Sequence, residues 1–128
     1  MPDQLNWYID MKIDLINTDD GDLVIKLGGD FDAAGSAEIR PRLESVAMQA
    51  APQHVFMDLR GVTFIDSSGV GAIVFMYKRL LEKSRQLRLV GAQGQPRELL
   101  ELLRIHKAIP MVFPTTREST ESTESCTA

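Results

Sequence analysis

The chain has 128 residues, of which 44% are hydrophobic and 25% are charged, and its formal net charge is −4. This length is that of one ordinary domain, and the composition is typical of a folded globular protein. The acidic balance argues against nucleic acid as a partner, because proteins that bind nucleic acid carry a basic face. The N-terminus lacks the pattern of a signal peptide, and no apolar stretch is long enough to span a membrane, so we expect a cytoplasmic protein without a membrane segment.

The two ends of the chain differ in composition from its centre. From Thr115 onward the residues are Thr, Ser, Glu and Arg with almost nothing apolar, which predicts a disordered tail over 115–128 and a single domain over 11–114. The one cysteine, Cys126, lies in this tail and has no second cysteine for a disulfide or a zinc site. We expect neither a metal nor a cofactor.

Two short apolar runs near the N-terminus predict a β-hairpin. They cover residues 12–16 and 23–28, on either side of the turn-rich segment 18–22. A helix is predicted over 35–49 by the spacing of its apolar residues. Pro41 lies inside this stretch, where proline costs about 3 kcal/mol. We therefore expect the helix to begin close before Pro41 or to kink there.

The central part of the chain predicts a strand followed by a long helix. The run 55–59 is mostly apolar without alternation, which favours a strand covered on both faces or lying deep in the sheet. A helix to about Lys83 follows, with a predicted apolar stripe of Val70, Ile73, Val74, Tyr77 and Leu81. Phe75 and Met76 then fall on the opposite face, where they are covered by the 18–22 loop or the chain termini, or form a partner patch.

The last third of the folded part predicts three more elements. These are a strand over 87–91, a helix opening at Pro96, and an edge strand over 111–113 between two prolines. Hairpin strands followed by alternating helices and strands indicate an α/β domain, with a mixed four- to five-stranded sheet and about three helices.

The segment Asp66-Ser67-Ser68 precedes the long helix and allows two interpretations. Any of the three side chains could cap the helix, which contributes roughly 1 kcal/mol. A helix N-terminus also offers free N–H groups and partial positive charge, which suits a phosphate on a serine. The charge of that phosphate, near −2, would then change the surface that a partner contacts. Spacing alone favours the capping interpretation.

Two glycines in the first turns of this helix, Gly69 and Gly71, also need a reason, because each costs about 1 kcal/mol relative to alanine. Either the helix start packs tightly on the sheet, or another protein approaches this surface closely.

The run from Met57 to Gly71, which contains Asp66-Ser67-Ser68-Gly69, closely resembles the STAS domains of bacterial anti-sigma-factor antagonists. The segment Gly29-Asp30-Phe31-Asp32 matches a second family motif, with Phe31 in place of the usual leucine. The resemblance extends from about Met11 to Phe113. Near the end of the third helix Arg104-Ile105 replaces the usual glycine-leucine, which leaves the client process open.

The resemblance implies a partner-switching cycle rather than an enzyme. The unphosphorylated antagonist would bind an anti-sigma factor that is also a serine kinase with a histidine-kinase-like ATPase fold. Phosphorylation of Ser67 would release it, and a PP2C-type phosphatase would restore it. The resemblance implies that the partner-binding residues are Asp30, Asp32, Asp66, Ser67, Ser68, Gly69 and Gly71, and the free protein is expected to be a monomer.

Three other functions are less favoured. A hydrolase with Ser67 as nucleophile would need glycine at position 65, where this chain has Ile65. A phosphate-binding loop is not favoured, because the chain has no Gly-x-x-x-x-Gly-Lys-Ser/Thr run. A STAS adaptor that works without phosphorylation, attached to a transporter or regulating another client, is the main alternative.

Overall fold

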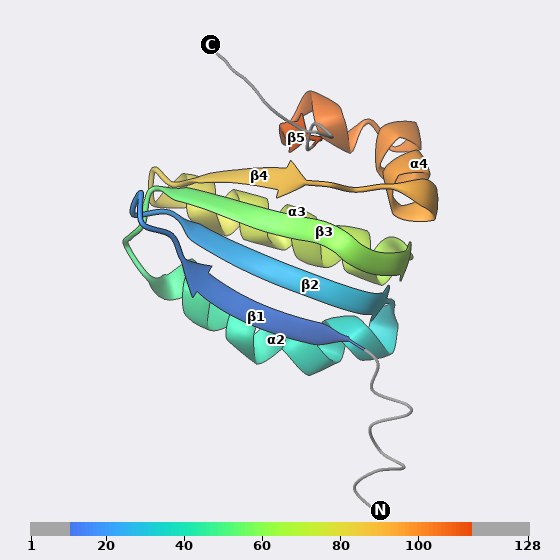
Figure 1. The fold of residues 1–128 in the computed structure, drawn as a ribbon, viewed down its shortest axis with the longest axis horizontal. Helices are drawn as coiled ribbons and strands as arrows, with labels where there is room; N and C mark the ends of the chain where they lie inside the picture. Colours follow the sequence, from blue (N-terminus) through green and yellow to red (C-terminus); the bar gives the residue numbers. More distant parts are fainter. Residues whose placement is uncertain (1–10, 114–128) are drawn as a thin grey trace, which may run out of the picture.

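The computed structural model describes residues 11–113 (Figure 1). The tail predicted over 115–128, with Cys126, lies outside the described residues. Five strands form one sheet in the order β1-β2-β3-β4-β5. Their bounds are Lys12–Asn17, Leu23–Phe31, His54–Ile65, Gln86–Val90 and Met111–Val112. β1 is antiparallel to β2, as the hairpin prediction requires, and the remaining neighbours are parallel. The predicted mixed sheet is confirmed.

The helices connect the parallel strands. α2 (Ala33–Met48) joins β2 to β3, and α3 (Ser67–Glu82) joins β3 to β4. Both lie behind the sheet in Figure 1, on one of its faces, and they pack against each other. α4 (Gly94–Leu102) and the short 3-10 helix η1 (Ile105–Lys107) follow β4. Among residues 11–113, no helix is long and apolar enough to cross a membrane.

The core lies between the sheet and the pair α2 and α3. One register row crosses all five strands, and its paired residues are Leu15, Ile25, Met57, Leu89 and Met111. The three central members of this row are completely buried. Side chains directly opposite each other share a face of the sheet, so this row forms the floor on which α2 and α3 pack.

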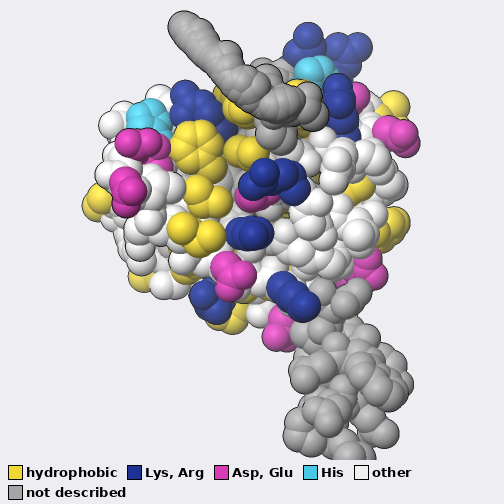
Figure 2. Space-filling view, in the orientation of Figure 1, with side chains coloured by type: hydrophobic (Ala, Val, Ile, Leu, Met, Phe, Trp, Pro, Cys, Tyr) yellow, Lys and Arg dark blue, Asp and Glu magenta, His cyan; other side chains and the backbone are white. Residues whose placement is uncertain are grey.

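The central strand β3 is longer than predicted. It runs from His54 to Ile65, past Arg60 and Gly61, where the apolar pattern stops. Its register with β2 shifts twice along this part, so the pairing continues through an irregular stretch. Of the two environments predicted for 55–59, the position deep in the sheet is the one found. The sheet face opposite α2 and α3 carries charged side chains around a hydrophobic group (Figure 2).

The apolar stripe predicted for α3 is correct at Val70 and Ile73, which are buried, and wrong at Leu81, while Val74 and Tyr77 are half-buried against the core. Leu81 is 54% exposed, whereas Leu80 and Met76 are completely buried. The buried face of α3 consists of Gly69, Val70, Ala72, Ile73, Met76 and Leu80. Met76 therefore belongs to the core and needs no loop to cover it, and Phe75 is half-buried on the side that faces α2.

Pro41 lies in the middle of α2, although one of the two expectations was that the helix begins close before it. α2 begins at Ala33, about two turns before Pro41, so the helix does not begin close before the proline. Pro41 is exposed on the outer side of α2, while Ile39 and Leu43 on either side of it are buried. The apolar face of α2 thus continues across the proline.

Candidate functional site

Two helices begin side by side at one edge of the sheet. β2 and β3 are parallel and end together, since Phe31 pairs with Ile65. Each strand is followed by an aspartate that caps the next helix. Asp32 accepts a hydrogen bond of 2.8 Å from the N–H of Gly35 at the start of α2. Asp66 accepts bonds of 2.9 and 3.2 Å from the N–H groups of Ser68 and Gly69 at the start of α3.

The third residue after each cap is a glycine that touches β2. A Cβ atom added to Gly35 would lie 2.3 Å from the carbonyl oxygen of Asp30. A Cβ atom added to Gly69 would lie at the same 2.3 Å from the carbonyl oxygen of Phe31. Both helix starts are therefore pressed against consecutive carbonyls of one strand. This explains Gly69 by packing, which was one of its two interpretations.

Gly71 has a different environment. It is exposed, and a Cβ atom added there would have no described atom within 4 Å. Packing within residues 11–113 therefore gives no reason for a glycine at this position.

Ser67 is the first residue of α3 and is exposed. Asp66 caps the helix, so the capping interpretation does not apply to the Ser67 side chain. Ser68 is half-buried, and its backbone N–H is bound to Asp66. The structure thus separates the three polar residues, which spacing alone could not do: Asp66 caps the helix, Ser67 is exposed, and Ser68 is half-buried.

Asp30 lies at the same edge. Its carboxylate accepts a hydrogen bond of 3.0 Å from the Thr63 hydroxyl on β3. Asp32 is committed to the α2 cap, and both aspartates are half-buried. Six of the residues predicted to bind a partner meet at the carboxyl edge of β2 and β3, and Gly71 follows within the first turns of α3.

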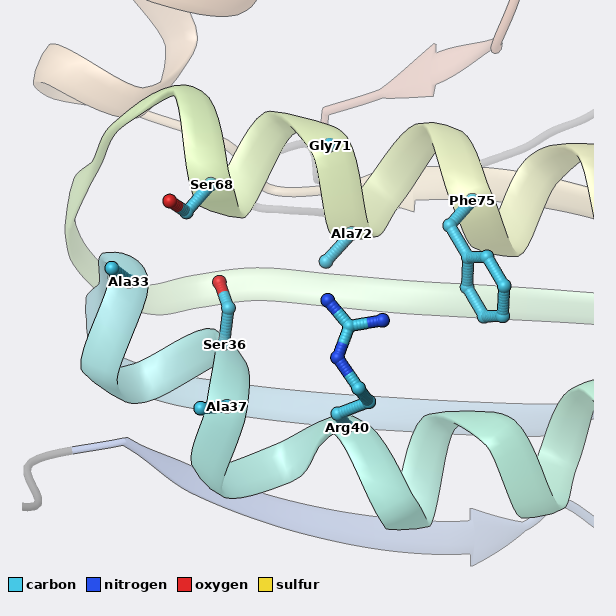
Figure 3. A pocket seen from close by; sticks show the side chains of 8 residues that line it. All are labelled: Ala33, Ser36, Ala37, Arg40, Ser68, Gly71, Ala72 and Phe75. Atoms are coloured by element: carbon cyan, nitrogen blue, oxygen red, sulfur yellow. The ribbon is translucent and has the colours of Figure 1, made fainter.

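A groove opens between α2 and α3 next to these residues (Figure 3). Its volume is about 470 Å³, and it is lined by Ala33, Ser36, Ala37, Arg40, Ser68, Gly71, Ala72 and Phe75. Ser36 and Arg40 were not among the residues predicted to bind a partner. The sequence does contain a sign of this groove. The lining positions recur at spacings of three and four along both helices, and most of them carry small residues.

No histidine is placed to activate Ser67 as a nucleophile. His54 begins β3, at the opposite end of that strand from Ser67, and its Nδ1 lies 3.3 Å from an Arg88 nitrogen. His106 lies in η1. Within residues 11–113 no group of three or more His, Cys, Asp or Glu side chains could hold a metal ion. The arrangement offers a polar contact surface on which Ser67 is exposed.

Comparison with known proteins agrees with this arrangement. The chain is 25% identical over 91 residues to an anti-sigma F factor antagonist of Paenibacillus polymyxa, covering 71% of this chain and 78% of that protein. An anti-sigma factor antagonist from Mycobacterium paratuberculosis has a similar structure, with a TM-score of 0.72, 21% identity, and coverage of 82% of this chain and 86% of that one.

The fold is also similar to that of SpoIIAA, which has been solved in two forms. The TM-score is 0.62 for the unphosphorylated form, with 20% identity over 84% of this chain and 92% of that chain. For the phosphorylated form of the Bacillus protein the TM-score is 0.63, with 20% identity over 88% and 93% of the two chains. The STAS domain family model matches residues 15–119, which is most of the sequence. The chain therefore belongs to the STAS domain family.

Proposed function

We propose that this protein is an anti-sigma factor antagonist that switches partners through phosphorylation of Ser67. In the unphosphorylated form it binds an anti-sigma factor that is also a serine kinase with a histidine-kinase-like ATPase fold. Phosphorylation releases it, and a PP2C-type phosphatase restores the binding form. The protein has no chemistry of its own in this cycle and is a monomer when free.

The observation that carries this proposal is the position of the Ser67 hydroxyl. It is exposed at the first residue of α3, and the capping of that helix is done by Asp66. A kinase can therefore reach the hydroxyl without opening the fold. The relative named an anti-sigma F factor antagonist supports the antagonist role. The two solved forms of SpoIIAA, unphosphorylated and phosphorylated, support control by phosphorylation.

The charges around Ser67 support release by phosphorylation. Asp66 is the preceding residue, and Asp30 and Asp32 lie at the same edge of the sheet. A phosphate adds a charge near −2 beside these carboxylates. A partner surface that fits the uncharged Ser67 hydroxyl must then desolvate this charged group or face it with its own carboxylates, and both are costly. Binding is lost although the domain stays folded.

An adaptor that works without phosphorylation is the second candidate, because the fold also occurs in a sulfate transporter family protein from Wolinella succinogenes, with a TM-score of 0.60 and 18% identity. An adaptor would bind its client equally well with either form of Ser67.

The proposal is tested by incubating the full chain with its kinase and ATP and mapping the product by mass spectrometry. We expect one phosphate, on Ser67, and no incorporation in Ser67→Ala. The matched control is Ser68→Ala, which should still be phosphorylated. A phosphate that maps to Ser68 or to the tail would contradict the assignment.

A second measurement separates the switch from the adaptor. Ser67→Asp should lose binding to the kinase in calorimetry while its melting temperature stays near that of the wild type. Ser45→Asp adds the same charge at an exposed position of α2 and should bind normally. Unchanged affinity of Ser67→Asp would favour the adaptor.

A further inference from the structure

The groove between α2 and α3 contains a buried hydroxyl without a partner. Ser36 is only 4% exposed, and its Oγ has no hydrogen-bond partner among residues 11–113. Figure 3 shows this oxygen pointing from α2 toward α3, between Ser68 and Ala72. Leaving a buried polar group unpaired costs on the order of 1–3 kcal/mol. An alanine would fit the same position, so the hydroxyl calls for a reason.

The second polar group in the groove is a cation. The Arg40 side chain is 54% exposed, and its closest acidic neighbour is Glu44 on the next turn, with an N–O distance of 4.0 Å. Such an exposed pair is worth little. Figure 3 shows the Arg40 guanidinium extended from α2 toward α3, beside Ser36. Both groups can donate hydrogen bonds. Within the described residues the Ser36 hydroxyl has no acceptor, and Arg40 has only the long, exposed pair with Glu44.

The walls of the groove leave room for a side chain. Ala33, Ala37 and Ala72 are small, and Gly71 opens the rim, since a Cβ atom there would meet nothing within 4 Å. Ser68 lies at one end of the groove and Phe75 at the other (Figure 3). A volume of about 470 Å³ exceeds that of any single side chain, and Ser68 places the groove directly beside Ser67.

We propose that this groove receives an acidic side chain of the partner kinase, whose carboxylate accepts hydrogen bonds from the Arg40 guanidinium and the Ser36 hydroxyl. This inference rests on the proposed function, because a kinase that reaches Ser67 covers the adjoining groove. A carboxylate is the occupant that the charges favour, since the groove presents donors and a positive charge.

The location of the charges also sets the orientation of the partner. The carboxylates of Asp30, Asp32 and Asp66 lie along the strand edge, whereas Arg40 lies two turns into α2. A partner with basic groups toward the edge and an acidic group toward the groove fits in one direction only. The acidic strand edge and the basic group in the groove thus specify how the kinase docks.

The test measures the affinity of the full-length variants for the purified kinase by calorimetry. Arg40→Ala should weaken binding roughly tenfold and Arg40→Glu further, because a like charge then faces the carboxylate. Arg42→Ala is the matched control. It removes the same charge from an exposed position two residues away, which points elsewhere on the helix, and should change the affinity less than about twofold.

Ser36→Ala distinguishes a binding role from a structural one. It removes an unpaired buried hydroxyl, so the melting temperature of the free protein should stay the same or rise, while the affinity for the kinase falls. A purely structural serine would not change the two quantities in opposite directions.

The outcomes separate the groove from the proposed function. If the wild type does not bind the kinase, both proposals are overturned. If the wild type binds and the Arg40 and Ser36 variants bind equally well, only the groove proposal is overturned. Saturable binding of inorganic phosphate that is lost in Arg40→Ala, with kinase affinity unchanged, would assign the groove to a small anion instead.

Discussion

Gly69 and Gly71 lie two residues apart in α3, and their surroundings are opposite. Gly69 is buried, and an added Cβ atom would lie 2.3 Å from a backbone oxygen and 2.6 Å from Cγ1 of Ile65. Backbone on a strand end cannot move aside as a flexible side chain can. Gly71 faces open space. The same substitution should therefore have opposite effects at the two positions.

We expect Gly69→Ala to lower the free energy of unfolding by about 1–3 kcal/mol through overpacking. Gly71→Ala should raise it by up to about 1 kcal/mol, because alanine favours the helix and nothing obstructs its methyl group. Urea unfolding of the two variants checks both signs. Equal effects would mean that the close contact at Gly69 relaxes freely.

Gly71→Ala also reports on the partner. Gly71 forms part of the groove rim, so its methyl group would enter the space that the partner approaches. A variant that is more stable but binds the kinase more weakly would show that binding, and not folding, is the reason for this glycine.

At the scale of the elements, α2 ends on a buried arginine supplied by another part of the chain. Arg85 is 1% exposed, and its Nη1 donates to the carbonyls of Val46 and Gln49 at 2.8 and 2.7 Å. Its Nε donates to the carbonyl of Pro52 at 2.7 Å. Burial lowers the pKa of Arg85 from its usual value. The last turn of α2 has no basic residue of its own, so Arg85 supplies the positive charge that a helix C-terminus favours.

Arg85→Ala should destabilise the protein by on the order of 3 kcal/mol, because three carbonyl groups each lose the hydrogen bond from Arg85. Arg85→Lys retains the charge but cannot reach all three acceptors, and it should lie between the alanine variant and the wild type. Arg79→Ala, on an exposed part of α3, is the control. Denaturant midpoints measure the series, and an unchanged midpoint for Arg85→Ala would refute this capping role.

The elements themselves could be predicted more reliably than their faces. The order of strands and helices follows from local apolar patterns and turn residues. The stripe of α3 could not be placed, because Val74, Tyr77 and Leu81 are as apolar as the residues that are actually buried. Only the packing of α3 against α2 and the sheet decides which side turns inward. Likewise, β3 continues past Arg60 and Gly61 because β2 runs beside it, which a local pattern does not contain.

At the scale of the whole molecule, the ion pair between Asp58 and Arg60 makes the free energy of unfolding depend on pH in the acidic range. Asp58 lies in the central strand and is 4% exposed. It accepts hydrogen bonds from the Arg60 side chain, of which the shortest is 2.7 Å, and from the Arg60 backbone N–H at 3.0 Å. Burial alone would raise the pKa of Asp58, but the hydrogen bonds and charge of Arg60 outweigh it, so that pKa lies below its usual value of 3.8.

Because the folded state binds this proton less readily than the unfolded chain does, the stabilisation is fully present above about pH 4. It is lost as the pH falls through the lowered pKa of Asp58. Asp58→Asn should therefore be less stable than the wild type at pH 7 by about 2 kcal/mol, with a gap that closes toward acid. Denaturant curves from pH 7 to pH 2 test this. A gap that stays constant would mean that another group controls the acid dependence.

The candidate site was predictable in part. Residues that are consecutive in the chain, such as Asp66, Ser67 and Ser68, can be recognised as a unit from the sequence. That Asp66 caps while Ser67 stays exposed depends on the geometry of the β3–α3 turn. The spacing of small residues marks one face of each helix in the sequence. That Ser36 and Arg40 face Ser68 is settled only once two helices separated by a whole strand pack together.

The contact of both helix starts with consecutive carbonyls of β2 has a kinetic consequence. Gly35 and Gly69 are in close contact with the carbonyls of Asp30 and Phe31. The backbone around Ser67 therefore has no room to rearrange when a phosphate is added. The partner would then meet the same backbone geometry in both forms, and encounter would not wait for a conformational step. The two forms would differ chiefly in how long the complex lasts, so that phosphorylation would shorten a residence time.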